Sequence, residues 1–147
     1  MSDAKFSFHP FTASETVSFE KCLADIRSLA DVIGTSLSVD GQASDLDILE
    51  DILRRLEWPK DKYAIICTGL AFGVCLASAA KLSWGQVKDD WGEEMSLKLP
   101  GYQYFIHPVG IITKRLEDRE EIDLHYLYSE LLRRIREDGS RQMPDRN

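Results

Sequence analysis

The sequence predicts a single α+β domain, with a helical layer around a central buried apolar helix, a three-stranded antiparallel meander and two C-terminal helices. Three observations support this fold class. Apolar residues recur at three- and four-residue steps before residue 60, an uncharged stretch follows at 63–80, and short β-rich segments lie between residues 84 and 107. The 147 residues suffice for one domain, 1–147, and no internal repeat divides them.

The N-terminal segment 1–13 is expected to be an extended arm laid on the domain, because Pro10 interrupts its apolar-polar pattern. A helix then begins with Thr12 or Ser14 as its N-cap, and Gly34 ends it, since glycine adopts the left-handed conformation that closes a helix. Its buried face is expected to comprise Phe19, Cys22, Leu23, Ile26, Leu29, Ala30 and Ile33.

A second amphipathic helix follows a loop at 35–43. Ser44 is its expected N-cap, and acidic residues in the first turn suit the positive end of the helix dipole. The helix is expected to end before Pro59, which suits the first turn of the next helix. Its buried face is expected to comprise Leu46, Leu49, Ile52, Leu53 and Leu56.

The third helix, at about 61–82, is the most apolar segment of the chain, because residues 63–80 carry no charge. About 18 apolar residues are the lower limit for crossing a bilayer, so a membrane span is the alternative to a central buried helix. Its alanines, glycines and hydroxyl residues insert weakly, and the amphipathic flanks need a partner, so the sequence favours the buried helix. Gly69 and Gly73 would then permit close helix–helix approach, and a homodimer is left open.

Beyond residue 82 the hydrophobic period changes to that of strands. Segments 84–88, 95–99 and 102–107 are rich in β-forming residues and are separated by turns. Alternation within the second strand predicts Met95, Leu97 and Leu99 toward the helices, with Ser96 and Lys98 in water.

Two helices are expected after the strands, at about 109–119 and 123–138. Ile112 and Leu116 face inward on the first. The inward residues of the second are Leu124, Leu127, Tyr128, Leu131, Leu132 and Ile135. Residues 139–147 are expected to form a flexible polar tail.

The overall charge limits the classes of partner. Eighteen Lys and Arg against 25 Asp and Glu give a net charge of −7, which repels phosphate backbones and argues against nucleic-acid binding. The N-terminus lacks the features of a signal peptide, so a cytoplasmic protein without membrane attachment is expected. Cys22, Cys67 and Cys75 are then expected to be free thiols, and no metal or cofactor motif is present.

No catalytic constellation is evident. His107, at the end of a predicted strand, is the best-placed base and the candidate pocket residue, with Cys75 or Ser78 as conceivable nucleophiles. No nucleophile elbow occurs, and nothing in the sequence brings these side chains together. Cys67 and Cys75 would lie about 12 Å apart along one helix, too far for a disulfide.

The acidic turn is the candidate interaction surface. Its members are Asp89, Asp90, Glu93 and Glu94, with the aromatic residues Trp84 and Trp91 beside them. Aromatic residues next to charges often anchor protein interfaces, so a basic protein partner is one hypothesis. The alternatives are a divalent-cation site and a solvated turn with Trp91 folded back onto the core.

A family resemblance appears when these segments are considered in order. A helix with Gly69 and Gly73 leads into Trp84-Gly85-Gln86-Val87 and Asp89-Asp90-Trp91-Gly92, and a strand to Pro108 precedes Ile112-x-Lys114-Arg115-Leu116-Glu117. Over roughly residues 45–135 this pattern resembles an uncharacterised bacterial domain of unknown function (DUF3806-like). The resemblance implies a bacterial, soluble α+β domain and no particular activity.

Two classes of function remain after these observations. The first is a non-catalytic acidic protein that acts by protein–protein interaction, for example an immunity protein that covers a basic toxin surface. The second is an enzyme, or a small-ligand or metal-binding domain, with a pocket between sheet and helices and His107 or the aspartates at its mouth.

Overall fold

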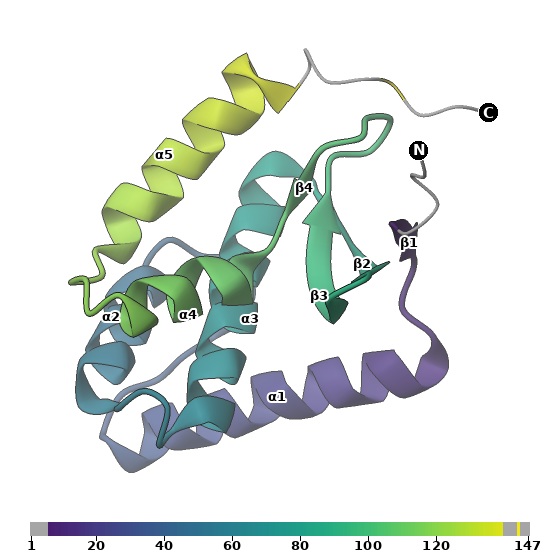
Figure 1. The fold of residues 1–147 in the computed structure, drawn as a ribbon. Coiled ribbons are helices and arrows are strands. Elements are labelled where there is room, and N and C mark those ends of the chain that lie inside the picture. Colours follow the sequence, from purple (N-terminus) through teal and green to yellow (C-terminus); the bar gives the residue numbers. More distant parts are fainter. Residues whose placement is uncertain (1–5, 140–143, 145–147) are drawn as a thin grey trace.

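The computed structural model describes residues 6–139 and Pro144, and these residues form an α+β fold (Figure 1). The helices are α1 (Ala13–Val32), α2 (Asp45–Arg55), α3 (Lys62–Ala80), α4 (Pro108–Glu117) and α5 (Leu124–Glu137). The strands are β1 (Ser7–His9), β2 (Ser83–Asp89), β3 (Gly92–Lys98) and β4 (Phe105–Ile106). They form one antiparallel sheet in the order β1-β2-β3-β4.

Helix α3 is the centre of the fold, as the sequence predicted. It contacts α1, α2, α4, α5 and strand β3 (Figure 1). In the described part of the chain it is the one helix long and apolar enough to cross a membrane, with a mean hydropathy of 1.9. Other elements bury 56% of that apolar stretch, which confirms the central buried helix.

The two glycines of α3 allow two different close contacts. A Cβ atom at Gly69 would lie 2.9 Å from the Cα of Val109, so α4 packs directly against the α3 backbone there. At Gly73 the same atom would lie 2.5 Å from the indole of Trp84 and 2.8 Å from Pro108. The predicted close helix–helix approach is therefore found at Gly69, whereas Gly73 mainly makes room for a strand side chain.

The N-terminal arm is more than an extended segment, because residues 7–9 form strand β1. This strand pairs with β2, so the sheet has four strands instead of the predicted three. The arm then leads directly into α1, where Thr12 is the N-cap and forms a capping box with Glu15. Pattern reasoning missed β1 because three residues are too few to show alternation.

Ser44 occupies the N-cap position of α2 as predicted, but its side chain makes no capping hydrogen bond. The buried carboxylate of Asp45 instead accepts hydrogen bonds from the backbone amides of Ser38 and Val39. These bonds hold the preceding loop against the helix and stabilise Val39 at a φ of 54°.

The two central strands are longer than predicted, and the last strand is shorter. Met95 and Leu97 face the helices as expected, but Ser96 is not in water: its exposed fraction is 0%. Rings from the arm and from β4 explain this burial, because Phe8 fills the space above Gly85, which pairs with Ser96. Phe105 packs on Phe8 at a centroid distance of 5.5 Å. Both faces of the sheet are therefore partly covered.

The predicted polar tail falls largely outside the described residues, since 140–143 and 145–147 are not among them. Gly139 is buried against Leu99 and Tyr104. Pro144 forms an isolated bridge with Tyr102.

Candidate binding surface

The tip of the β2–β3 hairpin carries the acidic turn. Asp89 pairs with Gly92 across the sheet, which leaves Asp90 and Trp91 as the two residues of the loop. The backbone amide of Trp91 donates to the Asp89 carboxylate over 2.8 Å, and Gly92 has a φ of 136°, which favours glycine. This local chemistry keeps the turn tight and directs the Trp91 side chain away from the sheet.

Trp91 is the most exposed large apolar side chain among the described residues, with an exposed fraction of 95%. The alternative in which this indole folds back onto the core is therefore wrong. Tryptophan is usually well buried in proteins, so an indole in water at the end of a hairpin is unusual.

Trp84 does not lie with the acidic turn. It is at the opposite end of β2, paired with Leu97, and is half-buried against Gly73. Phe19 and Phe11 pack on it at centroid distances of 4.7 and 6.1 Å. Trp84 therefore belongs to the hydrophobic core, and of the two candidate aromatic residues only Trp91 lies at the tip.

A cavity of about 270 Å³ adjoins Trp91 on one face of the hairpin. Asp89, Glu93 and Glu94 line it together with Trp91 and His107. Three carboxylates and one indole around a small cavity suit a cationic group, because the carboxylates supply charge and the indole face attracts cations.

Glu94 differs from the other acidic residues because it is tied to α4. One of its carboxylate oxygens accepts a hydrogen bond of 3.2 Å from the amide of Gly110, in the first turn of α4. The other lies 4.0 Å from Nδ1 of His107. A carboxylate at this place stabilises the positive end of the helix. Glu94 is thus a structural link between the hairpin and α4 as well as a surface charge.

The imidazole of His107 is held by the buried hydroxyl of Ser96, whose Oγ lies 2.7 Å from Nδ1. The same hydroxyl donates to the backbone carbonyl of Glu94 over 3.2 Å. Because a hydroxyl has one proton, both hydrogen bonds form together when Nδ1–H donates to Oγ. In the neutral ring this tautomer leaves Nε2 unprotonated, so His107 can accept a hydrogen bond from a ligand.

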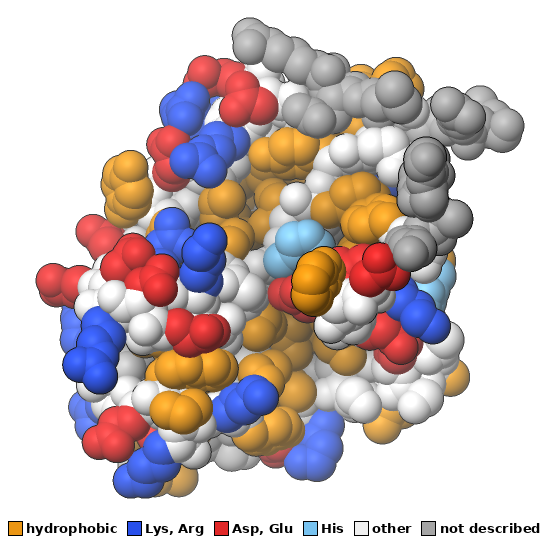
Figure 2. All heavy atoms as spheres, viewed as in Figure 1, with side chains coloured by type: hydrophobic (Ala, Val, Ile, Leu, Met, Phe, Trp, Pro, Cys, Tyr) orange, Lys and Arg blue, Asp and Glu red, His pale blue; other side chains and the backbone are white. Residues whose placement is uncertain are grey.

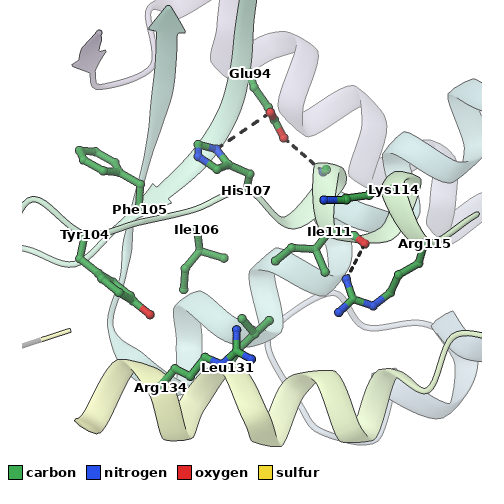
Figure 3. A pocket seen from close by; sticks show the side chains of 11 residues that line it. Glu94, Tyr104, Phe105, Ile106, His107, Ile111, Lys114, Arg115, Leu131 and Arg134 are labelled. Atoms are coloured by element: carbon green, nitrogen blue, oxygen red, sulfur yellow. Dashed lines mark hydrogen bonds and ion pairs between the residues drawn. The ribbon is translucent and has the colours of Figure 1, made fainter. Parts of the chain in front are cut away.

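His107 also lines a second cavity, of about 480 Å³, between β4, α4 and α5 (Figure 3). Its floor is apolar, and cationic side chains from two helices stand around it. The lining residues include Ile106, Ile111 and Leu131 on the floor, Lys114, Arg115 and Arg134 at the sides, and Tyr104 and Phe105 at one end. Figure 2 shows the same hollow as exposed apolar side chains between α5 and β4, flanked by Lys and Arg.

The structure does not bring the conceivable nucleophiles, Cys75 and Ser78, into the cavities that His107 lines. Cys75 is buried in α3 with its thiol near the carbonyl of Gln42, and Ser78 lies against Gly41. Neither lines the two cavities that contain His107. Burial raises the pKa of Cys75 to about 12, so its thiol stays protonated at neutral pH.

The described residues contain no side-chain cluster that supports metal binding. In the part of the chain that the structure describes, no group of three or more His, Cys, Asp or Glu side chains could hold a metal ion.

Sequence reasoning did not group the cations of the larger cavity. In the sequence Arg134 lies near the end of a predicted helix, where a cation is favourable in any case, and Lys114 and Arg115 belong to the family pattern. They come together because α4 and α5 flank β4, which local sequence does not show. One signal was available: Leu131 and Arg134 are three residues apart, so they share a helix face.

Comparison with known families and structures supports the fold. The family described as "Domain of unknown function (DUF3806)" matches residues 45–128, which confirms the resemblance over most of the expected range. The match includes α2, α3, the hairpin and α4, and it ends before Arg134. Among curated proteins, no sequence matches the chain.

A crystal structure from Bacteroides thetaiotaomicron VPI-5482 is similar to this chain, with a TM-score of 0.76 and 15% sequence identity. The similarity covers 89% of this chain and 48% of that one, so the chain spans about half the length of this neighbour. At this identity the likeness concerns the fold alone.

Proposed function

The chain belongs to the family of the domain of unknown function DUF3806, and for this member we propose a non-catalytic role in protein–protein interaction. The observation that carries the proposal is Trp91, an indole 95% exposed at the end of a hairpin. Tryptophan is enriched among the residues that contribute most binding energy at protein interfaces. Burying this indole in a partner would remove a large apolar surface from water.

The partner is a protein with a basic contact surface. Asp89, Glu93 and Glu94 line the cavity beside Trp91, and the chain as a whole carries a net charge of −7. A lysine or arginine side chain entering this cavity would meet carboxylates and the indole face together. Charge complementarity of this kind speeds association and makes it sensitive to salt.

The burial of the Ser96 hydroxyl beside His107 favours a binding role over a catalytic role. Ser96 is fully buried and shares its hydrogen bonds with His107 and the backbone, so the hydroxyl positions the imidazole and does not face a substrate. A cytoplasmic immunity protein that covers a basic toxin surface is one concrete form of this proposal. It is consistent with the small size and acidic charge of the chain.

The experiment is affinity capture from the native organism with quantitative mass spectrometry at low and high ionic strength. Trp91→Ala should lose the specific partner at both salt concentrations, whereas Tyr126→Ala, an exposed aromatic residue on α5, should retain it. Equal recovery by the two variants would exclude the hairpin tip as the interface.

A charge-matched pair of variants tests the electrostatic part. The first replaces Asp89, Asp90, Glu93 and Glu94 with the corresponding amides, which keep an acceptor oxygen for the amides of Trp91 and Gly110. The second makes the same change at exposed carboxylates of the α4–α5 region, Glu117, Asp118, Glu120 and Glu121. Only the first should slow association at low salt, and equal rates would contradict a basic partner at the tip.

A further inference from the structure

The cavity between β4, α4 and α5 combines an apolar floor with positive charge, although the protein as a whole is acidic. Ile106, Ile111 and Leu131 form the floor. Lys114 and Arg115 reach it from α4 and Arg134 from α5, so cations from two helices converge on one apolar surface (Figure 3).

These cations are weakly neutralised by the protein itself. Within residues 6–139, no carboxylate lies within salt-bridge distance of Lys114 or Arg115; Arg115 donates instead to the carbonyl of Ile111. Arg134 shares Glu130 with Arg133, and Glu130 lies closer to Arg133, at 2.6 Å against 3.4 Å for Arg134. An incoming anion therefore meets positive charge without having to displace a strong ion pair.

Among the described residues that line the cavity, the one carboxylate, Glu94, is held at the other side. Figure 3 shows Glu94 beside His107, across the cavity from Arg115 and Arg134. The amide of Gly110 holds this carboxylate in place. The cavity therefore has a negative side and a positive side with an apolar surface between them, which orients a ligand that has one charged end.

We propose that this cavity binds a small organic acid that carries one carboxylate on an apolar body. The carboxylate pairs with Arg134 and Arg115, since guanidinium groups match carboxylate geometry. The apolar body lies on Ile106, Ile111 and Leu131. Burial raises the pKa of the Tyr104 phenol, so it remains protonated at neutral pH and can donate a hydrogen bond at the cavity edge.

The size and charge of the cavity define the ligand further. A volume of about 480 Å³ is within the range of small-molecule sites, roughly 300–1,000 Å³. Glu94 would repel a second carboxylate at the far end of a ligand. The cavity should therefore prefer a medium-chain monocarboxylate to a dicarboxylate of the same length and to the neutral alcohol.

The test uses octanoate, octanedioate and octanol as probes, with calorimetric titration and amide chemical shifts of the full chain. Octanoate should bind saturably and shift the amides of β4, α4 and α5, and octanedioate and octanol should bind at least about tenfold more weakly. No saturable octanoate binding, equal binding of the three probes, or shifts confined to another region would each overturn the proposal.

A matched pair of variants tests whether octanoate binding depends on the cations that line the cavity. Arg134→Gln should weaken octanoate binding about tenfold, whereas Arg136→Gln, an exposed residue on the same helix that does not line the cavity, should leave it unchanged. Equal dissociation constants for the two variants would contradict the site. Trp91→Ala should not change octanoate binding, so this proposal can fail or succeed independently of the interaction at the hairpin tip.

Discussion

The two tryptophans of the β2–β3 hairpin are seven positions apart and lie in opposite environments. Trp84, at the base, packs between Gly73, Pro108 and the rings of Phe11 and Phe19. Trp91, at the tip, is 95% exposed. The same residue type thus supports the core at one end of a strand pair and stands in water at the other.

The difference follows from what surrounds each end of the hairpin. The base lies over α3, where a glycine leaves space for an indole, whereas the tip carries carboxylates and leaves its indole in water. Substitutions at the base should therefore change the free energy of unfolding, and substitutions at the tip should change binding while the fold remains stable. Substitutions at the two ends of the hairpin can test this division.

Filling the space under Trp84 should have the largest effect. Gly73→Leu places a side chain where a single Cβ would already lie 2.5 Å from the indole and 2.8 Å from Pro108. The free energy of unfolding in urea should fall by at least about 2 kcal/mol through overpacking. Ala79→Leu, on the exposed face of the same helix, is the control and should be nearly neutral. Equal stability of the two variants would mean that the base is not tightly packed.

Because of the buried thiols of α3, the free energy of unfolding should decrease at alkaline pH. Burial raises the pKa of Cys67 and Cys75 to about 12 in the folded chain, from an ordinary value of 9.0. The unfolded chain releases these protons first, so their stabilising effect is complete below about pH 9 and is lost as the pH rises toward 12. Stability should decrease by about 1 kcal/mol per thiol by about pH 10.

The matching control is the double variant Cys67→Ala with Cys75→Ala. It should be less stable at neutral pH because of the lost packing, yet its stability should decrease less steeply above pH 9. Parallel slopes for the variant and the wild type would contradict the burial of these thiols. In the native state both thiols should also react slowly with a disulfide reagent and quickly after unfolding.

Removing the N-cap of α1 should lower the free energy of unfolding by a smaller amount than filling the space at Gly73. The Thr12 hydroxyl accepts from the amide of Glu15 over 3.1 Å, and the helix that it caps carries Phe19 onto Trp84. Thr12→Ala should cost about 1 kcal/mol in unfolding free energy. Ser14→Ala, the other N-cap that the sequence allowed, should be neutral, and the reverse order would contradict the observed cap.

Hydrophobic period was enough to predict the helices and the central position of α3. The sheet shows where this approach ends: Ser96 has the alternation of a solvent-facing residue, but rings from two distant segments cover it. Strand β1 was missed for a related reason, because a three-residue strand is stabilised by its neighbour β2 and has no pattern of its own.

The candidate surface was predictable only where its residues are adjacent in the chain. The acidic turn and Trp91 come from one short segment, so sequence alone could single them out, but the exposure of the indole is known only from the structure. The larger cavity joins His107 with Lys114 and with Arg134, and Arg134 lies beyond an intervening loop and most of α5. Such a site depends on the packing angle of two helices, which local propensities do not determine.

Substitutions at the tip of the hairpin should change the free energy of unfolding least and partner binding most. Trp91→Ala removes a side chain that is 95% exposed, so the free energy of unfolding should change by less than about 0.5 kcal/mol. The amide of Trp91 that donates to Asp89 is backbone and remains in the variant, so the turn is preserved. In the wild type, the fluorescence of this indole should be quenched readily by acrylamide, while Trp84 and Trp58, both half-buried, should be shielded. The accessible fraction should therefore disappear in Trp91→Ala with the unfolding midpoint unchanged, and a loss of stability above about 1 kcal/mol would mean that the tip supports the fold and is not a free binding surface.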